Sequence, residues 1–161
     1  MGTQKVLLPF AGKTIIEHIV DQLLAADLER VLVVVGYQAE RVIGQLAQRD
    51  VSVVANPDYQ VGMLSSIRCG FAALPEHCKA ALVALGDQPT IEANLVNRML
   101  GAFAETGKGL VVPVYRGKRG HPTLVSTSYR DEIMTGYDEV GLRGLLHAHP
   151  DDVFELAVTT P

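Results

Sequence analysis

The sequence predicts an α/β fold in three layers, with a mostly parallel sheet between helices and a small β-excursion. Uninterrupted apolar runs at residues 30–35 and 79–85 are typical of strands covered on both faces. Segments with apolar residues at helical spacing alternate with strand candidates as far as residue 105. This alternation of helix and strand favours a layered α/β sheet.

The length and composition indicate one domain. The chain has 161 residues, 48% hydrophobic and 20% charged, which fits a single globular core. No internal repeat, low-complexity tract or linker divides it. We therefore expect residues 1–161 to form a single domain.

The charge and the cysteines limit the partners and the compartment. The net charge is −4, and lysine and arginine are scattered, so the basic patch of a nucleic-acid binder is missing. Cys69 and Cys78 form no metal-binding or disulfide-rich pattern, and no apolar stretch approaches the roughly 20 residues that span a bilayer. We expect a cytoplasmic protein that binds neither nucleic acid nor membrane.

The first half of the chain reads as repeated helix and strand units. Thr14 and Glu17 have the spacing of a capping box at the start of a helix over residues 14–26. The next units are a strand at 30–35, a helix at 39–49, a strand at 51–55, a helix at 63–74, a strand at 79–85 and a helix at 91–105.

Beyond Gly107 the rhythm changes. Strand candidates at 109–114 and 121–126 are separated by a basic, glycine-bearing connection, and this spacing permits a hairpin or a β-excursion. Helices at 129–137 and 141–149 and a strand at 153–158 complete the chain.

Asp87 follows the apolar run at residues 79–85. The carboxyl ends of parallel strands form the ligand crevice of open α/β sheets, and a carboxylate there is suited to hold a divalent cation on a substrate phosphate. An alternative is that Asp87 only caps the next helix, because Asp before Pro89 is common at such junctions. The first interpretation is a metal-assisted nucleotide enzyme.

Lys5 lies on a loop before an apolar stretch and a helix. Its ammonium could act as a point charge on phosphate oxygens, although single lysines are often only solvated. The pattern around Lys5 leaves both interpretations open.

Five separated motifs in the chain resemble one family. They are MGxxKxLLPxxGxxxIxxxV at residues 1–20, VxVVxG at 31–36, NPxYxxGMxSS at 56–66, LGDQP at 85–89 and RGHP at 119–122. In this order they resemble the MobA-like nucleotidyltransferases, and within them the molybdenum cofactor cytidylyltransferases. The resemblance runs through almost the whole chain and is far more specific than any one motif.

The resemblance implies a Rossmann-like nucleotide-binding fold and transfer of a nucleoside monophosphate to a phosphorylated acceptor, with release of pyrophosphate and help from Mg²⁺. Lys5 matches the family lysine that binds triphosphate oxygens, and Asp87 matches the aspartate that ligates the metal. A cation and a lysine there would stabilise charge on the α-phosphate oxygens in the transition state.

Further residues match the nucleotide side of the family site. The residues that match its loop and helix start, with Gly2 from the preceding glycine-rich loop, are Gly2, Asn56, Gly62, Met63, Ser65 and Ser66. Without the resemblance, Asn-Pro is an ordinary turn and Ser-Ser at a helix start is ordinary capping. With it, we expect these residues to line the nucleotide pocket.

The resemblance also implies an acceptor side, which we assign to Gln88, Arg119, Gly120, His121 and Arg143, because RGHP matches a signature of the cytidylyltransferases and Arg143 lies in a segment similar to one near the family's acceptor region. For His121 we expect positioning or phosphate recognition rather than direct catalysis. Arg143 has an alternative role as a solvated or paired residue on an amphipathic helix. The other four histidines are expected at the surface.

The chain departs from the family pattern at both ends. Of the family's opening strand and its glycine-rich loop LAAGxSxRMG, only Met1 and Gly2 remain, and the chain stops before a DIDTPED-like acidic segment. We expect the sequence to be a piece of a longer polypeptide, which an intact mass near 17.4 kDa would contradict. A protein that truly begins at Met1 is expected to have weak or no transferase activity.

The leading functional hypothesis is transfer of CMP from CTP to a molybdopterin-type acceptor, with a molybdenum hydroxylase as a possible client of the product. The alternatives are a methylerythritol phosphate cytidylyltransferase or a guanylyltransferase of the same fold, and a non-catalytic protein that binds or delivers the molybdenum cofactor. Base choice stays open, because most of the loop that reads the base is outside the sequence.

Overall fold

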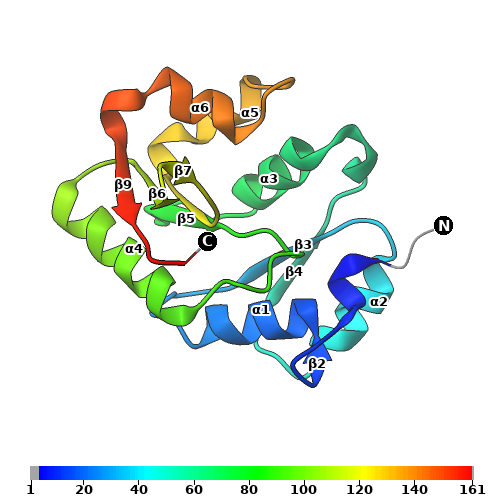
Figure 1. Cartoon of the computed structure of the whole chain (residues 1–161). Helices are drawn as coiled ribbons and strands as arrows, with labels where there is room; N and C mark the ends of the chain where they lie inside the picture. The colour runs from blue at the N-terminus through cyan, green and yellow to red at the C-terminus, as the bar shows by residue number, and fades with distance from the viewer. Residues whose placement is uncertain (1–3, 161) are drawn as a thin grey trace.

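The structure is a computed structural model, and it describes residues 4–160. Gly2, which the sequence assigns to the nucleotide site, lies outside the described residues. Helices cover both sides of the strands (Figure 1): α1, α2 and α4 lie on one side, and α3, α5 and α6 lie on the other. The predicted three-layer α/β class is confirmed.

The six α-helices have the following bounds: α1 Ile15–Leu24, α2 Ala39–Leu46, α3 Met63–Ala72, α4 Ala93–Thr106, α5 Arg130–Thr135 and α6 Leu142–Ala148. Single 3-10 turns are η1 Lys5–Leu7, η2 Tyr59–Val61, η3 Thr127–Tyr129 and η4 Pro150–Asp152. The predicted capping box begins α1, since the backbone N–H of Thr14 donates to Glu17 Oε2 at 2.8 Å and the N–H of Glu17 donates back to Thr14 Oγ1 at 3.4 Å.

The larger sheet contains the strands β5 (Ala80–Val83), β6 (Leu110–Tyr115), β7 (Lys118–Arg119), β8 (Thr123–Ser126) and β9 (Val153–Ala157). Strand β9 runs parallel to β6 along one edge, so β7 and β8 share the other edge of β6. Both are antiparallel to β6, and the connection after β6 is therefore a hairpin whose returning strand is interrupted at residues 120–122. Strand β8 then pairs antiparallel with β5.

The smaller sheet joins β3 (Leu32–Val35) and β4 (Ser52–Ala55) in parallel. A short hairpin of β1 (Pro9–Phe10) and β2 (Lys13–Thr14) precedes α1 and was not predicted. Within residues 4–160, each of β3 and β5 is paired along one edge only.

Helices α1 and α3 hold the two sheets together. On one face, Ile16 of α1 packs with Val35 of the smaller sheet, whereas Ile19 packs in the cluster that contains Leu82 of the larger sheet. On the other face, Gly70 of α3 lies against β3, and Phe71 joins the core over β6 and β8. Side-chain burial therefore joins the sheets.

Strand β6 is the centre of the core. Leu110 and Val112 pack with α3, α5 and α6, whereas Val111 packs with Met99 of α4, and all four residues are 0% exposed. Alternate residues of a strand face opposite sides of the sheet, so this run needs apolar side chains at every position. Within residues 4–160, the structure has no helix long and apolar enough to cross a bilayer.

Candidate active site

The candidate site lies where β3, β4 and β5 end. Gly36 and Tyr37 follow β3, Asn56 follows β4, and Gly86 and Asp87 come shortly after β5. The carboxyl edge of an α/β sheet is where such loops form ligand crevices. Each loop is fixed by a different set of contacts.

Asp87 lies in a turn after β5 and is exposed. The N-cap of α4 is Glu92, so Asp87 does not cap the helix that follows it, in contrast to the alternative interpretation. Among residues 4–160, no side chain forms a hydrogen bond or ion pair with its carboxylate. Asp87 is thus an oxygen ligand that the fold leaves available.

Lys5 is held near the Asp87 loop by the packing of its neighbour Val6. A Cβ built on Gly86 would lie 3.5 Å from Val6 Cγ1, so the turn that carries Lys5 packs against the residue before Asp87. The amide of Gln4 donates to the backbone carbonyl of Tyr37 at 2.8 Å, which fixes this segment to the loop after β3. Lys5, whose side chain is exposed, therefore lies in a turn that is packed against the Asp87 loop.

Asn56 organises the loop after β4. It is 5% exposed, and its amide donates to the hydroxyls of Ser65 at 2.9 Å and Ser66 at 3.0 Å, while its carbonyl oxygen accepts from the N–H of Asp58 at 2.9 Å. Both amide hydrogens are used inside the protein. The structure therefore gives Asn56 a role in shaping the loop at the start of α3.

The start of α3 requires Gly62. Its φ of 134° and ψ of 177° are open to glycine and strained for other residues. Ser65 Oγ lies 2.7 Å from the carbonyl oxygen of Gly62, which holds the first turn of the helix to the loop. Met63 is exposed, and the ring of Tyr59 packs against Gly36, which joins this loop to the end of β3.

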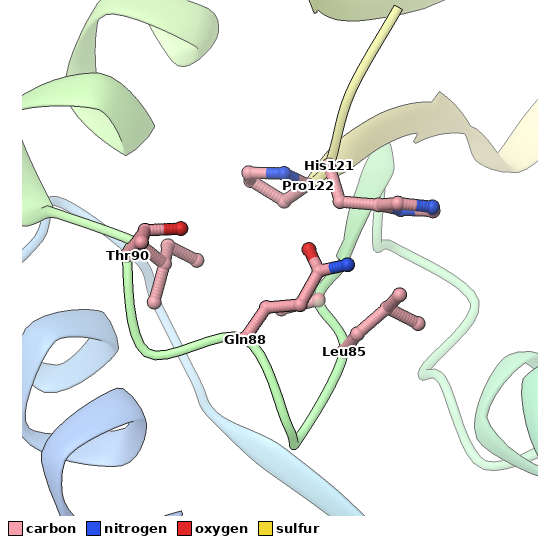
Figure 2. A pocket seen from close by; sticks show the side chains of 7 residues that line it. Leu85, Gln88, Thr90, His121 and Pro122 are labelled. Atoms are coloured by element: carbon pink, nitrogen blue, oxygen red, sulfur yellow. The ribbon is translucent and has the colours of Figure 1, made fainter. Parts of the chain in front are cut away.

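His121 comes close to Asp87 through strand pairing. Val83 of β5 pairs with Thr123 of β8, so the loop after β5 runs beside the residues that precede β8. Figure 2 shows the Gln88 side chain pointing toward His121 and the buried Pro122. The peptide bond between His121 and Pro122 is cis.

The hollow among these residues has a volume of about 10 Å³ and is lined by Leu85, Gln88, Thr90, His121 and Pro122, with two further apolar residues. This is space for about one water molecule, so a substrate would have to bind on the open side, over the exposed residues. Thr90 was not among the residues predicted from the sequence.

The electrostatics of His121 link it to Arg143 and Asp87. Desolvation of the imidazole lowers the pKa of His121, the positive charge of Arg143 lowers it further, and the negative charge of Asp87 opposes both. The residue as a whole is exposed. Arg143 is exposed in the first turn of α6.

Two further residues that the sequence assigns to the acceptor side lie in β7 and in the connection to β8. The guanidinium of Arg119 donates to Glu155 on β9 at 2.8 Å, and the N–H of Gly120 donates to the carbonyl of Pro113 at 2.9 Å. Both are engaged with the sheet. The structure thus brings together the segments that carry Lys5, Asp87, Gln88 and His121, and the charge of Arg143 acts on His121. Arg119 is paired elsewhere.

The prediction that the four histidines other than His121 lie at the surface is partly wrong. His77 and His147 are exposed, as expected. His18 is half-buried and stacks edge-on against Phe10, with ring centroids 4.8 Å apart. His149 is also half-buried, and its Nε2 lies 2.8 Å from Glu132 Oε1, because the end of α6 packs on α5. These contacts join residues from different elements, which sequence spacing does not reveal.

The fold and site define a nucleotidyltransferase-type α/β protein. The family model for the MobA-like NTP transferase domain matches residues 1–153, and the chain belongs to this family.

Two curated relatives are similar to the chain. The molybdenum cofactor cytidylyltransferase of Escherichia coli K12 is 30% identical over 128 residues, which cover 78% of this chain and 63% of the relative. The nicotine blue oxidoreductase of Paenarthrobacter nicotinovorans is 30% identical over 153 residues, covering 91% of this chain and 74% of the relative. The chain thus spans less than two thirds of the E. coli protein.

Solved structures share the fold. Rv0371c of Mycobacterium tuberculosis superposes with a TM-score of 0.88 at 25% identity, covering 100% of this chain and 82% of that one. Its complex with manganese gives a TM-score of 0.84 at 24% identity, covering 98% and 82%. A nucleotidyl transferase from Methanothermobacter gives 0.82 at 26% identity, covering 99% and 76%.

Proposed function

We propose that the protein transfers CMP from CTP to a molybdopterin-type phosphorylated acceptor and releases pyrophosphate. An acceptor phosphate oxygen attacks the α-phosphorus, and the bond to the β-phosphate oxygen breaks as pyrophosphate leaves. The single observation that carries the proposal is the exposed carboxylate of Asp87, on a loop that packs against the turn of Lys5 and whose charge, with that of Arg143, acts on His121.

Mg²⁺ fits the residues that are present. Mg²⁺ is usually bound by one or two carboxylates together with substrate phosphates, and Asp87 offers one carboxylate that no described side chain occupies. Within residues 4–160, no group of three or more acidic, histidine or cysteine side chains forms a protein-only metal site. When bound, the ion would neutralise charge on the transferring phosphoryl group. The manganese complex of a protein with the same fold supports a divalent cation.

Three side chains have separate tasks in this proposal. Lys5 would pair with triphosphate oxygens, and Arg143 would bind the phosphate of the acceptor. His121 has a pKa below its ordinary value of 6.5, so it is largely neutral at pH 7 and would position the acceptor by hydrogen bonding. The Asn56 loop would shape the nucleotide side through Ser65 and Ser66.

The E. coli relative supports CTP and the molybdenum cofactor, and delivery of the product to a molybdenum hydroxylase would follow from that chemistry. The rivals are a methylerythritol phosphate cytidylyltransferase, a guanylyltransferase, and a non-catalytic cofactor-binding protein. We also propose a cytoplasmic setting, which is supported by the free thiols of Cys69 and Cys78.

Pyrophosphate release tests the proposal, measured with CTP, GTP and ATP in the presence of Mg²⁺ and molybdopterin. We expect turnover selective for CTP. Asp87→Asn is expected to lower kcat/KM by about a hundredfold or more, as the loss of a main electrostatic contact does. Asp50→Asn, a change of the same kind at an exposed site without a described partner, should leave the rate unchanged.

Lys5→Met and Lys79→Met form a second matched pair, because Lys79 is also exposed but lies before β5, at the end away from Asp87. Only the Lys5 change should weaken CTP binding. CTP binding without turnover would support the non-catalytic rival. Turnover that survives Asp87→Asn would reject the proposal.

A further inference from the structure

Arg68 links α3 to the loop between α5 and α6. It lies on α3, one helical turn after Ser65, and its side chain is 23% exposed. Its Nε donates to the carbonyl of Ile133 at 2.8 Å, and its terminal nitrogens donate to the carbonyl of Gly136 and the carboxylate of Asp138, each at 2.7 Å. One guanidinium thus binds three points on the far segment.

Two of these points are at the end of α5. Ile133 lies in its last turn, and Gly136 is its C-cap. Carbonyls at a helix C-terminus lack partners within the helix and carry partial negative charge, so an arginine there both satisfies and stabilises them. Asp138 is 72% exposed and contributes less, because solvent screens exposed ion pairs.

The segment after Gly136 leads directly to Arg143. The N–H of Gly141 donates to the carbonyl of Tyr137 at 2.8 Å and closes a turn before α6. Gly144 of α6 packs so closely against the side chains of Tyr137 and Val140 that no Cβ fits there. The segment at residues 137–141 therefore packs against the start of α6, which carries Arg143.

We propose that Arg68 is a positioning residue that holds the turn at residues 136–141 and thereby keeps Arg143 beside His121, where it binds the acceptor phosphate. This inference rests on the proposed function. In this arrangement α3 connects the two sides of the site. Ser65 is held by the loop on the nucleotide side, and Arg68 holds the segment on the acceptor side. The arginine itself touches neither substrate.

Steady-state kinetics with both substrates varied test this role. Arg68→Ala is expected to raise KM for the acceptor about tenfold, a loss typical of one charged hydrogen bond. KM for CTP should change by less than about twofold. Arg68→Lys, which keeps the charge but not the planar donors, should recover part of the loss.

Arg130→Ala is the matched control. Arg130 also uses its guanidinium to bind backbone carbonyls, those of Leu74 and Pro75 at 3.3 and 3.5 Å, but it is at the other end of α5. Its loss should lower stability without a selective rise in the acceptor KM. An equal rise in both variants would show that Arg68 acts only through general stability, and would overturn the proposal.

A double-mutant cycle separates positioning from an independent role. If Arg68 acts through Arg143, the double variant Arg68→Ala with Arg143→Ala should bind the acceptor no more weakly than Arg143→Ala alone. Additive losses would overturn the proposal.

Hydrogen exchange provides a readout that needs no turnover. The amides of Gly141 and Gly144, which bond within the turn and the start of α6, should exchange faster in Arg68→Ala than in Arg130→Ala. Unchanged exchange would overturn the positioning role even if the transferase is active. A wild-type protein without turnover would reject the proposed function, while faster exchange in Arg68→Ala would still support the structural link.

Discussion

The guanidinium of Arg49 donates hydrogen bonds to both carboxylate oxygens of Asp21, at 2.6 and 3.1 Å. A further nitrogen binds Glu17 at 3.1 Å, and Lys13 binds Asp21 at 2.6 Å. Arg49 lies just after α2, and both acids lie on α1, so this half-buried group fixes the two helices to each other.

Arg49→Ala is therefore expected to lower the free energy of unfolding by about 1 to 3 kcal/mol, since it leaves two partly buried carboxylates without their shared donor. Urea denaturation measures the effect. Arg41→Ala serves as the control. Within residues 4–160 the side chain of this exposed arginine binds Gln38 alone, so its loss should cost less than about 0.5 kcal/mol. Equal effects of the two changes would contradict the structure.

The same group makes stability depend on pH. Hydrogen bonds from Arg49 are the largest cause that lowers the pKa of Asp21 from 3.8 to about 2. A depressed carboxyl pKa stabilises the folded state above the unfolded pKa, and this contribution is lost as pH falls through the folded value. We expect wild type to lose about 1 to 2 kcal/mol between pH 5 and pH 2 through this residue, allowing for its partial exposure. The stability difference between wild type and Asp21→Asn should shrink over that range, and a constant difference would rule the linkage out.

Asn56→Ala should affect both stability and nucleotide binding. It removes three hydrogen bonds of a buried amide, which we expect to cost about 2 to 3 kcal/mol. The loop that it releases carries Ser65, so CTP affinity measured by calorimetry should fall as well. Asn97→Ala is the control, because Asn97 accepts one hydrogen bond, from Asp27, away from the site. That variant should bind CTP like wild type.

Two glycine-to-alanine changes in helices should act in opposite directions. Gly101 of α4 has open space where a Cβ would lie, so Gly101→Ala should stabilise the protein by about 0.5 to 1 kcal/mol through helix propensity. In α6, a Cβ on Gly144 would overlap Tyr137 and Val140, so Gly144→Ala should lower Tm despite the same gain in propensity. The two melting temperatures, measured side by side, check the close packing of α6.

Local patterns predicted most elements of the fold. The capping box of Thr14 and Glu17 placed α1, and the apolar runs placed β3, β5 and β6, because helix starts and buried strands depend on nearby residues. The β1–β2 hairpin was missed because its strands have two residues each. The sequence left the hairpin after β6 as one of two alternatives, since strand pairing depends on distant partners.

For the site, the place of Asp87 after a buried strand and of Lys5 before a helix suggested both residues, and the family motifs supported them. The structure brings their two segments together. Whether these residues do the proposed chemistry remains a prediction. Arg68 could not be found in this way, because its partners lie 65 to 70 residues away and two of them are backbone carbonyls. Likewise, only the structure shows that the amide of Asn56 is used inside the protein.

The pairing of Val83 with Thr123 has a consequence for biosynthesis. Strand β8 lies between β5 and β6 although it follows both in the chain, so β5 cannot join the larger sheet until residue 126 has left the ribosome. At a synthesis rate of about 5 to 20 residues per second, the edge of β5 stays unpaired for several seconds. A chaperone could cover this edge during that time. The same late pairing brings the Asp87 loop beside His121, so the candidate site of a nascent chain forms only after the sheet closes.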